Sequence, residues 1–510
     1  MIVTTSDQIK AIDTMAIHTY KIPGILLMEH AAIEVMSAIE ANGLELPLYI
    51  LCGTGNNGGD GLAIARLAKL KGYDVIVLIV GNVAAMTPDA LVMYDALSHL
   101  NINIEIIANE DDLPAKIASN SIQVVDAILG IGCTRDLDGI YKESVDWLNR
   151  VSAYTYAVDM PSGIHCDSGA TMGSSVKANE TITFTLPKVG QVIGDGKYAS
   201  GQLKIVDIGI PETVLTTFDY PYELIDHRVL EFMPKRQANG HKMTFGRLLI
   251  IAGSAAMSGA GLLAAKAAYR TGTGLIEVLT HKNGLLAMQQ ALPEAIVHTY
   301  ENEEEGHVLM EKLKERLDQF QCILIGPGIS RSDLSKSMLK VVLTHGVGPI
   351  VIDADGLNLL PEVIEAVDAY IHPIIITPHL GEMHRLTNHC VQEIAYAPFA
   401  FSDAYSKAHG VITVLKSATT VVADGHDHYC INVLGNDGMA TAGSGDVLAG
   451  VITGMVGQGV EAYKAAVLAV GLHSMAGDMA AFNLSKRGLM ASDMIDALQV
   501  LLKEYEEANQ

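Results

Sequence analysis

The sequence predicts an α/β protein with two parallel-sheet domains, the first of them doubly wound. Strand-sized apolar stretches alternate with stretches of helical periodicity in both halves of the chain. This alternation is interrupted once, between about residues 211 and 241, where prolines stand among mixed polar residues. A chain of 510 residues is also too long for one ordinary hydrophobic core, so two to four domains are expected.

The first half opens with a helix signature and continues as a β–loop–α–β unit. Thr5-Ser6-Asp7-Gln8 resembles a capping box and predicts a helix through about Thr19, with a second helix from Gly24. Two apolar strands flank a helix predicted from Asp60 to Leu70, and this order implies parallel strands with a right-handed crossover. The predicted strands of this half are Leu46–Cys52, Asp74–Val80, Ile122–Ala127, Tyr156–Asp159 and Glu180–Phe184.

The second half restarts the alternation at Gly246, after a domain boundary that we place near residues 220 to 230. We therefore assign residues 1–220 to the first domain and 225–510 to the second. No internal repeat of fixed period is visible, which argues against a solenoid. The helix Gly259–Tyr269 is predicted here, with the strands Arg247–Ala252, Leu275–Val278, Cys322–Ile325, Pro349–Asp353, Ile374–Thr377 and Val411–Leu415.

The composition argues against several classes of protein. Hydrophobic residues make up 49% and charged residues 18%, which is a globular and not a disordered balance. The net charge of −24 makes nucleic acid an unsuitable partner. The six cysteines are scattered without a C-x-x-C pair, which is typical of reduced cytoplasmic thiols and argues against zinc or disulfides. No apolar run approaches the roughly 18 residues that span a bilayer, and no signal peptide is visible, so we expect a cytoplasmic protein.

A glycine-rich segment, Gly53-Thr54-Gly55-Asn56-Asn57-Gly58-Gly59-Asp60-Gly61, follows the first long strand and opens a helix. It satisfies G-x-G-x-x-G, but the acidic residue that a dinucleotide site needs after the next strand is missing, since that strand ends Val80-Gly81-Asn82. Its amide and carboxylate oxygens suit a hard cation. The alternative is a turn tightened by Asn and Gly.

Three aspartates occupy matching positions in the first half. Asp126 and Asp159 end predicted strands, and Asp60 follows a third one. Because ligands bind at the carboxyl ends of parallel strands, we expect the three to converge. Any one of them alone would more often be a helix cap.

These segments resemble a known family. The Gly53–Gly61 segment, Val125-Asp126-Ala127-Ile128-Leu129-Gly130 and Val158-Asp159-Met160-Pro161-Ser162-Gly163 together look like the NAD(P)H-hydrate epimerase domain, over residues 1 to 220. The resemblance implies a Rossmann-like fold that interconverts the R and S epimers at the hydrated C6 of the nicotinamide ring. We choose Asp159 as its proton-transfer carboxylate. The implied potassium ligands are Asn57, Asp126 and Ser162. The implied contacts to hydrated NAD(P)H are Asn56, Asn57, Gly58, Gly59, Asp60, Gly130, Ile131, Gly132, Cys133, Thr134, Arg135, Asp136 and Asp159.

The most informative segment of the second half runs from Asn436 to Gly450, where small residues lead to Asp446 and an apolar helix begins. A glycine-rich backbone permits close approach of a ligand, and a helix N-terminus suits a phosphate. This arrangement indicates phosphoryl chemistry with Asp446 as a base or proton shuttle. The alternative is a tight helix–helix contact. We favour the functional interpretation, because five glycines weaken a packing helix: Gly438, Gly443, Gly445, Gly450 and Gly454.

Four further segments follow predicted strands and so point to the same crevice: Gly253–Ala260, Gly326–Gly328, Thr377–Met383 and Lys416–Thr420. Lys416 could neutralise phosphate charge, or be an ordinary exposed lysine. His379 could orient a substrate hydroxyl or carboxamide, or cap a helix.

This set looks like the ADP-dependent NAD(P)H-hydrate dehydratase domain, whose fold is ribokinase-like, over residues 225 to 510. The resemblance implies that a nucleotide phosphorylates the C6 hydroxyl of the S epimer and that loss of phosphate regenerates NAD(P)H, with release of AMP when ADP is the donor. The fused architecture favours ADP over ATP, with Mg²⁺. The implied contacts to the hydrate are Ala260, Gly328, His379 and Asp446, and those to the nucleotide are Lys416, Ser417, Ala418, Thr419, Thr420 and Gly445.

The leading hypothesis is thus a bifunctional repair enzyme for hydrated NADH and NADPH. Its partners would be these small molecules and ADP, with no nucleic acid or membrane, and we expect a homo-oligomer. A small-molecule kinase, acting on a sugar or a vitamin precursor, would share the second domain but has no need of the first. A nucleotide sensor without turnover has no need of Asp159 and Asp446 as proton-transfer groups.

Overall fold

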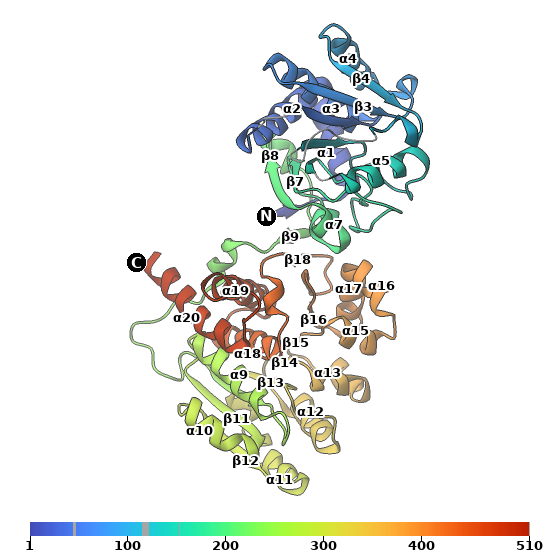
Figure 1. The fold of residues 1–510 in the computed structure, drawn as a ribbon. Helices are drawn as coiled ribbons and strands as arrows, with labels where there is room; N and C mark the ends of the chain where they lie inside the picture. Colours follow the sequence, from blue (N-terminus) through green and yellow to red (C-terminus); the bar gives the residue numbers. More distant parts are fainter. Residues whose placement is uncertain (44–46, 115–121, 152, 509–510) are drawn as a thin grey trace. The chain divides into compact units, whose positions relative to one another are not determined.

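The computed structural model describes residues 1–43, 47–114, 122–151 and 153–508. The chain divides into two compact units, one of residues 2–222 and one of residues 223–510 with residue 1. Each unit is an α/β domain in which helices cover a mostly parallel sheet (Figure 1).

The sheet of the first domain has the strand order β4-β3-β2-β5-β6-β7-β8, and each neighbouring pair is parallel. This is the order of a Rossmann-like sheet, in which the chain reverses direction across the sheet between β2 and β5. Loops at the carboxyl ends of β2 and β5 therefore splay apart and leave room for a ligand. The strands are β2 (Leu48–Cys52), β3 (Val75–Val80), β4 (Asn103–Ile107), β5 (Ile122–Ala127), β6 (Ala153–Val158), β7 (Glu180–Phe184) and β8 (Gln202–Val206).

The predicted capping box is present at the first helix. Thr5 Oγ1 accepts the backbone N–H of Gln8, and the Gln8 side chain accepts that of Thr5. The two-residue strand β1 (Ile2–Val3) precedes this helix. The helices are α1 (Ser6–His18), α2 (Gly24–Ala41), α3 (Asn56–Leu70), α4 (Pro88–Ser98), α5 (Gly139–Arg150), α6 (Val189–Val192), α7 (Gly194–Ala199) and α8 (Glu212–Leu215), with 3-10 turns at Val83–Ala85 and Glu110–Asp112.

Several boundaries in this domain differ from the prediction. Helix α1 ends at His18 and not at Thr19, β3 begins at Val75 and not at Asp74, and β6 begins at Ala153 and not at Tyr156. Two further differences bear on the site. Helix α3 begins at Asn56 and not at Asp60, because Gly55 has the extended conformation of an N-cap and the next residues already form the first turn. Strand β6 ends at Val158, and Asp159 then adopts a left-handed φ of 62° that ends the extended backbone. The predicted start of β2 at Leu46 lies outside the described residues.

The second sheet has the order β9-β18-β17-β16-β15-β14-β13-β10-β11-β12, parallel from β16 to β12, with β17 and β18 antiparallel at the other end. The order reverses between β10 and β13, which gives a second crevice at the carboxyl ends of the strands. The strands are β9 (Tyr222–Leu224), β10 (Arg247–Ile251), β11 (Leu275–His281), β12 (Ile296–Tyr300), β13 (Cys322–Ile325), β14 (Ile350–Ile352), β15 (Ile374–Ile376), β16 (Val411–Leu415), β17 (Thr420–Ala423) and β18 (Tyr429–Asn432).

Helices cover both faces of this sheet. The sheet has a hydrophobic core on each face, and alternate residues of β10 point into one or the other. Leu248 and Ile250 belong to one core, and Leu249 and Ile251 belong to the other. The helices are α9 (Ser258–Arg270), α10 (Leu285–Ala291), α11 (Glu303–Lys314), α12 (Asp333–His345), α13 (Asp355–Leu359), α14 (Ile364–Asp368), α15 (Leu380–Thr387), α16 (Val391–Tyr396), α17 (Pro398–His409), α18 (Ser444–Gly457), α19 (Ala462–Asn483) and α20 (Ala491–Ala508), with 3-10 turns at His227–Phe232, Lys282–Gly284, Leu317–Gln319, Leu360–Glu362 and Asp437–Met439.

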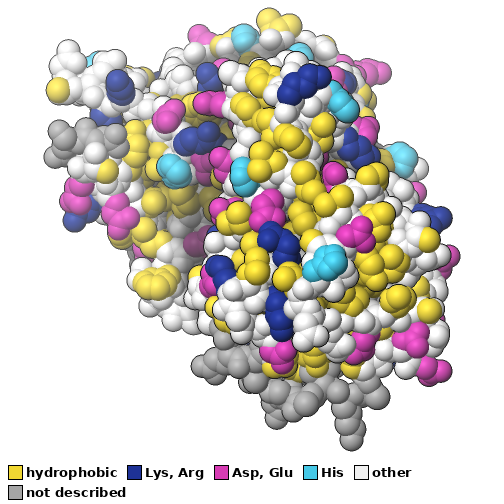
Figure 2. All heavy atoms as spheres, turned by 90° about the horizontal axis from the view of Figure 1, so that it is seen from above, with side chains coloured by type: hydrophobic (Ala, Val, Ile, Leu, Met, Phe, Trp, Pro, Cys, Tyr) yellow, Lys and Arg dark blue, Asp and Glu magenta, His cyan; other side chains and the backbone are white. Residues whose placement is uncertain are grey.

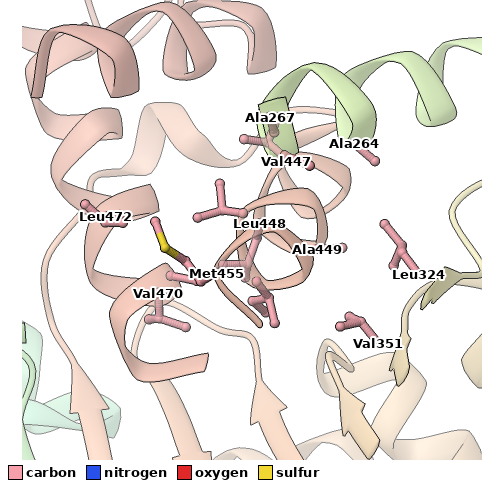
Figure 3. Close-up of a cluster of buried hydrophobic side chains, with 14 of the residues drawn as sticks. Ala264, Ala267, Leu324, Val351, Val447, Leu448, Ala449, Met455, Val470 and Leu472 are labelled. Atoms are coloured by element: carbon pink, nitrogen blue, oxygen red, sulfur yellow. The ribbon is translucent and has the colours of Figure 1, made fainter. Parts of the chain in front are cut away.

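Helix α18 packs directly on α9 and on the sheet. Leu324 and Val351 of the sheet and Ala264 of α9 surround its side chains in a continuous apolar cluster (Figure 3). A Cβ atom on Gly450 would clash with the Ala264 carbonyl oxygen, and one on Gly454 would clash with Thr271. These two glycines therefore serve the helix–helix contact, which was the alternative to the functional interpretation of this segment.

Helix α19 passes the test of length and composition for a membrane span, with a mean hydropathy of 1.4, which the sequence analysis missed. However, 72% of its apolar window is buried inside the structure, as in the core helix of a globular domain.

The acidic side chains that produce the negative net charge are not gathered in one patch on the face seen in Figure 2. On that face, Asp and Glu side chains are interspersed with basic and apolar ones.

Candidate active sites in the two domains

The first domain has a cavity of about 410 Å³ at the carboxyl ends of its central strands. Its walls come from α1, α2, the start of α3 and the segments that follow β5, β6 and β7. The structure brings seven of the predicted contact residues to this cavity: Asn56, Asn57, Asp60, Gly130, Ile131, Gly132 and Asp159.

The remaining predicted contacts do not line it. Gly58 and Gly59 are buried, where a Cβ on Gly58 would clash with the Gly53 carbonyl and one on Gly59 would meet Met28. These two glycines therefore allow α3 to pack closely against its surroundings. Cys133 is buried, whereas the other three are exposed to solvent: Thr134, Arg135 and Asp136.

Asp159 is held rigidly in the cavity wall. Its Oδ1 atom accepts hydrogen bonds from the Phe184 backbone N–H at 3.1 Å, from Thr183 Oγ1 at 3.2 Å and from the Lys188 ammonium. Among the described residues, none donates to Oδ2. One oxygen is thus fixed by the protein, and the other is available to a ligand.

Lys188 is a site residue that the sequence analysis missed. Its side chain is 1% exposed and bonded to Asp159, Thr183 Oγ1 (2.8 Å) and the Phe184 carbonyl (3.1 Å). A buried ammonium with three partners stabilises a nearby carboxylate. The signal was a lysine directly after Pro187 and close to the end of a strand, but no spacing rule connects that position with Asp159.

Three further carboxyls line the same cavity, those of Asp13 in α1, Asp60 in α3 and Asp89 in α4. Burial, with the added repulsion of Asp159, raises the pKa of Asp13 to about 6. Burial also raises the pKa of Asp60 well above its usual range, and Asp159 and Asp13 add to the effect. The cavity therefore holds carboxyls with different affinities for protons, which is typical of sites that transfer protons.

Asp126 is not among the residues that line the cavity. Its carboxylate is fully buried and accepts the Ser162 hydroxyl at 2.6 Å, the Ser162 N–H at 2.8 Å and the Ile128 N–H at 3.3 Å. Burial raises the pKa of Asp126 to about 6 despite these donors. Asn57 lies against Gly130, and its buried amide nitrogen has no hydrogen-bond partner in the described part of the chain. The three predicted metal ligands are thus an oxygen-rich set of one carboxylate, one hydroxyl and one unpartnered amide.

In the second domain, Gly443 has a left-handed φ of 88° and turns the chain into the first turn of α18, which carries Asp446. Burial and Asp353 raise the pKa of Asp446 to about 6, while Lys416 acts to lower it. The free N–H groups of this turn lie next to the Lys416 ammonium, since a Cβ on Gly445 would be 3.2 Å from Lys416 Nζ. Backbone N–H donors and the Lys416 ammonium therefore lie beside a carboxyl, that of Asp446, whose pKa is about 6.

Lys416 is a paired residue and not an ordinary exposed lysine. Its Nζ donates to Asp353 Oδ1 at 2.8 Å, and the Thr377 hydroxyl donates to the same oxygen at 2.6 Å. Burial acts to lower the pKa of Lys416, but Asp353 and then Glu382 raise it above its ordinary value. Asp353 was not among the predicted site residues, although it directly follows β14 as Asp159 directly follows β6.

His379 caps α15. Its Nδ1 accepts the N–H groups of Gly381 at 3.0 Å and Glu382 at 3.3 Å, and the Glu382 carboxylate accepts the His379 N–H at 2.8 Å. This is the alternative that we weighed against a ligand contact. The His379 Nε2 atom lies 3.4 Å from Glu382 Oε1. The backbone of His379 also forms a parallel β-bridge with that of Lys416. The His379 ring is therefore held close to Lys416, which is bonded to Asp353.

The other predicted residues of this domain lie in the segments that follow β10, β13 and β16. Gly328, with φ 64°, brings its backbone against Ala260, since an added Cβ would be 3.0 Å from that of Ala260. The Ser417 hydroxyl accepts the Thr419 N–H at 3.2 Å, within a turn that joins β16 to β17. The nucleotide-binding residues predicted in this turn are Lys416, Ser417, Ala418, Thr419 and Thr420.

The sequence of this chain matches two known protein families, one in each domain. The family described as NAD(P)H-hydrate dehydratase matches residues 248–500, and the one described as YjeF-related protein N-terminus matches residues 25–190. A bifunctional NAD(P)H-hydrate repair enzyme of Moorella thermoacetica is 35% identical over 99% of this chain and 98% of its own. The chain belongs to the family of bifunctional NAD(P)H-hydrate repair enzymes.

Other similarities agree with this family. A repair enzyme of the same description from Escherichia coli is 34% identical over 88% of this chain and 84% of its own. A ribokinase-like superfamily protein of Enterococcus faecalis has a crystal structure that covers 56% of this chain and 98% of its own, with 27% identity and a TM-score of 0.50. The ribokinase-like fold predicted for the second domain is thus confirmed.

Proposed function

We propose that this chain repairs hydrated NADH and NADPH in two steps. The first domain interconverts the R and S epimers, and the second uses ADP to dehydrate the S epimer, with release of AMP and phosphate. The observation that carries the proposal is the similarity to a bifunctional repair enzyme over nearly the full length of both chains. A kinase of the same fold is not favoured, because its reaction gives the first-domain cavity no role.

The first-domain cavity suits the chemistry of epimerisation. The C6 carbon of the hydrated ring carries a hydroxyl and the ring nitrogen N1, so proton transfer can open it to an aldehyde and close it again on the other face. Asp159 offers an unengaged oxygen, while Lys188 stabilises the charge on the same carboxylate. The isoleucine- and methionine-lined walls would exclude competing water.

Three residues at or next to the cavity fit a potassium ion. Asn57, Asp126 and Ser162 carry amide, carboxylate and hydroxyl oxygens, the ligands that hard cations take. No group of three or more His, Cys, Asp or Glu side chains is placed to hold a metal ion in the described ranges, so a single carboxylate among neutral oxygens is the available set. A bound ion would supply fixed positive charge close to the substrate.

We expect the Asp126→Ala variant to weaken binding of the hydrate to the first domain and to remove its dependence on potassium. The substitution takes away the only carboxylate of the set, so an ion would lose its charged ligand. Epimerisation measured with and without potassium ions, by chromatography of the two epimers, tests this. Repair of pure S hydrate by the second domain serves as the control for folding. Normal epimerisation by the variant in potassium-free buffer would exclude the ion.

The second-domain cluster suits phosphoryl transfer. Asp446 would take the proton of the C6 hydroxyl as its oxygen attacks the terminal phosphorus of ADP, and AMP would leave. The N–H groups of α18 and the Lys416 ammonium would stabilise the negative charge. Hydroxide leaves carbon poorly and phosphate leaves well, so loss of phosphate and a C5 proton then restores the C5–C6 double bond of NADH.

We expect ADP with Mg²⁺ to support dehydration and ATP to support it poorly. The motivation is the fusion of both domains in one chain, as in the Moorella and Escherichia relatives. Mg²⁺ is expected as part of the co-substrate, because phosphates carry dense charge in the transition state. Initial rates of NADH recovery at matched concentrations of the two nucleotides give the comparison, and faster turnover with ATP would reverse the assignment.

A further inference from the structure

Asp13 has an unusual position on α1. The residues Ile9, Asp13 and Ile17 are four apart, so they lie on one stripe of the helix, and all three line the first-domain cavity. The carboxyl therefore stands between two isoleucines. Within the described ranges, the Asp13 carboxyl makes neither a hydrogen bond nor an ion pair.

The position of Asp13 is fixed by the chain that precedes it. The Ser6 N–H and hydroxyl donate to Asp167 at 2.6 and 2.8 Å, which anchors the start of α1. The Thr4 N–H donates to the Pro187 carbonyl at 2.9 Å, and the Val189 N–H donates to the Thr4 carbonyl at 2.9 Å. These bonds tie the beginning of the helix to the segment that carries Lys188. Asp13 thus belongs to the same rigid unit as the Lys188–Asp159 pair.

An unpartnered carboxyl in an apolar stripe is unfavourable for folding, because its charged form loses hydration without compensation. An isoleucine at position 13 would complete the stripe. The protein instead keeps an acid there, with its pKa raised to about 6 by burial and by Asp159. A carboxyl of this kind can hold a proton near neutral pH and still release it, as a general acid must. The more strongly raised pKa of Asp60 suits a group that stays protonated and donates a hydrogen bond.

We propose that Asp13 is a second catalytic residue of the first site and transfers a proton to and from N1 while Asp159 serves the C6 hydroxyl. This inference rests on the epimerase function proposed above. It gives the two carboxyls complementary surroundings: Asp159 is held beside the Lys188 ammonium, and Asp13 stands in the isoleucine stripe.

The step balances without any co-reactant. Asp159 takes the proton of the C6 hydroxyl, the C6–O bond becomes a carbonyl and the C6–N1 bond breaks. N1 keeps the electron pair of that bond and receives the proton of Asp13. The aldehyde turns about the C5–C6 bond and presents its other face. N1 then attacks C6, Asp13 recovers the proton from N1, and Asp159 returns its proton to the oxygen.

The test compares Asp13→Asn with Asp60→Asn and with Asp7→Asn, an exposed position on the same helix whose side chain is 93% exposed. We expect Asp13→Asn to lower the kcat of epimerisation on the order of 10²–10⁴-fold with KM changed only a few-fold. Asp60→Asn should mainly raise KM, and Asp7→Asn should behave as wild type. In the Asp13→Ala variant, added formate should restore part of the rate, because a small acid can enter the space left by the side chain.

The outcomes separate the inference from the function on which it rests. If the wild-type chain does not interconvert the epimers, the proposed function fails. If the wild type is active and Asp13→Asn keeps its kcat, the role of Asp13 is excluded. A loss of kcat in Asp13→Ala that formate does not relieve, in a chain that still dehydrates pure S hydrate, would also contradict proton transfer by Asp13 and leave only a packing role.

Discussion

Replacing Asp446 by asparagine should abolish ADP-dependent recovery of NADH from both epimers and leave their interconversion intact. The expected loss is on the order of 10²–10⁴ in rate, because a positioned base is removed while the amide keeps the size of the side chain. The S epimer loses its route directly, and the R epimer loses it after epimerisation. Chromatography of both epimers over time, beside NADH absorbance, follows the two reactions in one assay.

The same carboxyl predicts a pH dependence. A base must be ionised, and the pKa of Asp446 is raised to about 6, so dehydration should fall as the pH drops through about 6. Glu382 also has a pKa raised to about 6, chiefly by burial. If the Glu382→Gln variant still shows the fall in dehydration rate below about pH 6, that fall belongs to the titration of Asp446. Undiminished recovery of NADH by Asp446→Asn would remove Asp446 from the mechanism.

Replacing Asp159 by asparagine should have the opposite effect. The S epimer is still repaired, whereas the R epimer is consumed only at its slow spontaneous rate of epimerisation. The expected loss in catalysed epimerisation is again on the order of 10²–10⁴. The physical reason is that the amide cannot take the hydroxyl proton and leaves the buried Lys188 ammonium without its charged partner.

Loss of that partner can also affect folding, so the control is repair of pure S hydrate and the unfolding temperature of the variant. A Thr183→Val variant removes one donor to Asp159 without removing charge and should cost much less. If Asp159→Asn also stops repair of pure S hydrate in a folded chain, the two sites are not independent.

Much of the fold could be predicted from the sequence, because strand-sized apolar runs and capping residues are local signals. The Thr5–Gln8 capping box and the strand Glu180–Phe184 have the predicted form. The start of α3 was predicted too late, because Asn56 and Asn57 are residue types that are common in turns. In the structure, Gly55 is the extended N-cap residue and the helix begins directly after it, at Asn56.

The sites were less accessible to sequence reasoning, since their residues meet only through tertiary structure. The rule that carboxylates at strand ends define the crevice found Asp126 and Asp159, and its application to β14 would have found Asp353 as well. Lys188 and Asp13 obey no such rule: one follows a proline and the other lies in a helical stripe. Gly450 and Gly454 were misread, because glycine for packing and glycine for a ligand look alike in a sequence.

The expected homo-oligomer and cytoplasmic location stay predictions. The roles of the individual site residues also stay predictions, and their tests are the variants described above. All six cysteines lie within the described residues and are free there, and their reduced state stays a prediction.

The most direct test of the two-step repair is to incubate the purified chain with a mixture of R and S hydrated NADH, Mg²⁺ and ADP. NADH absorbance and the two epimers are followed together. The account predicts that absorbance returns until both epimers are consumed, and that without nucleotide the epimers only equilibrate. Persistence of the R epimer after the S form has been used up, or no return of NADH with either ADP or ATP, would contradict it.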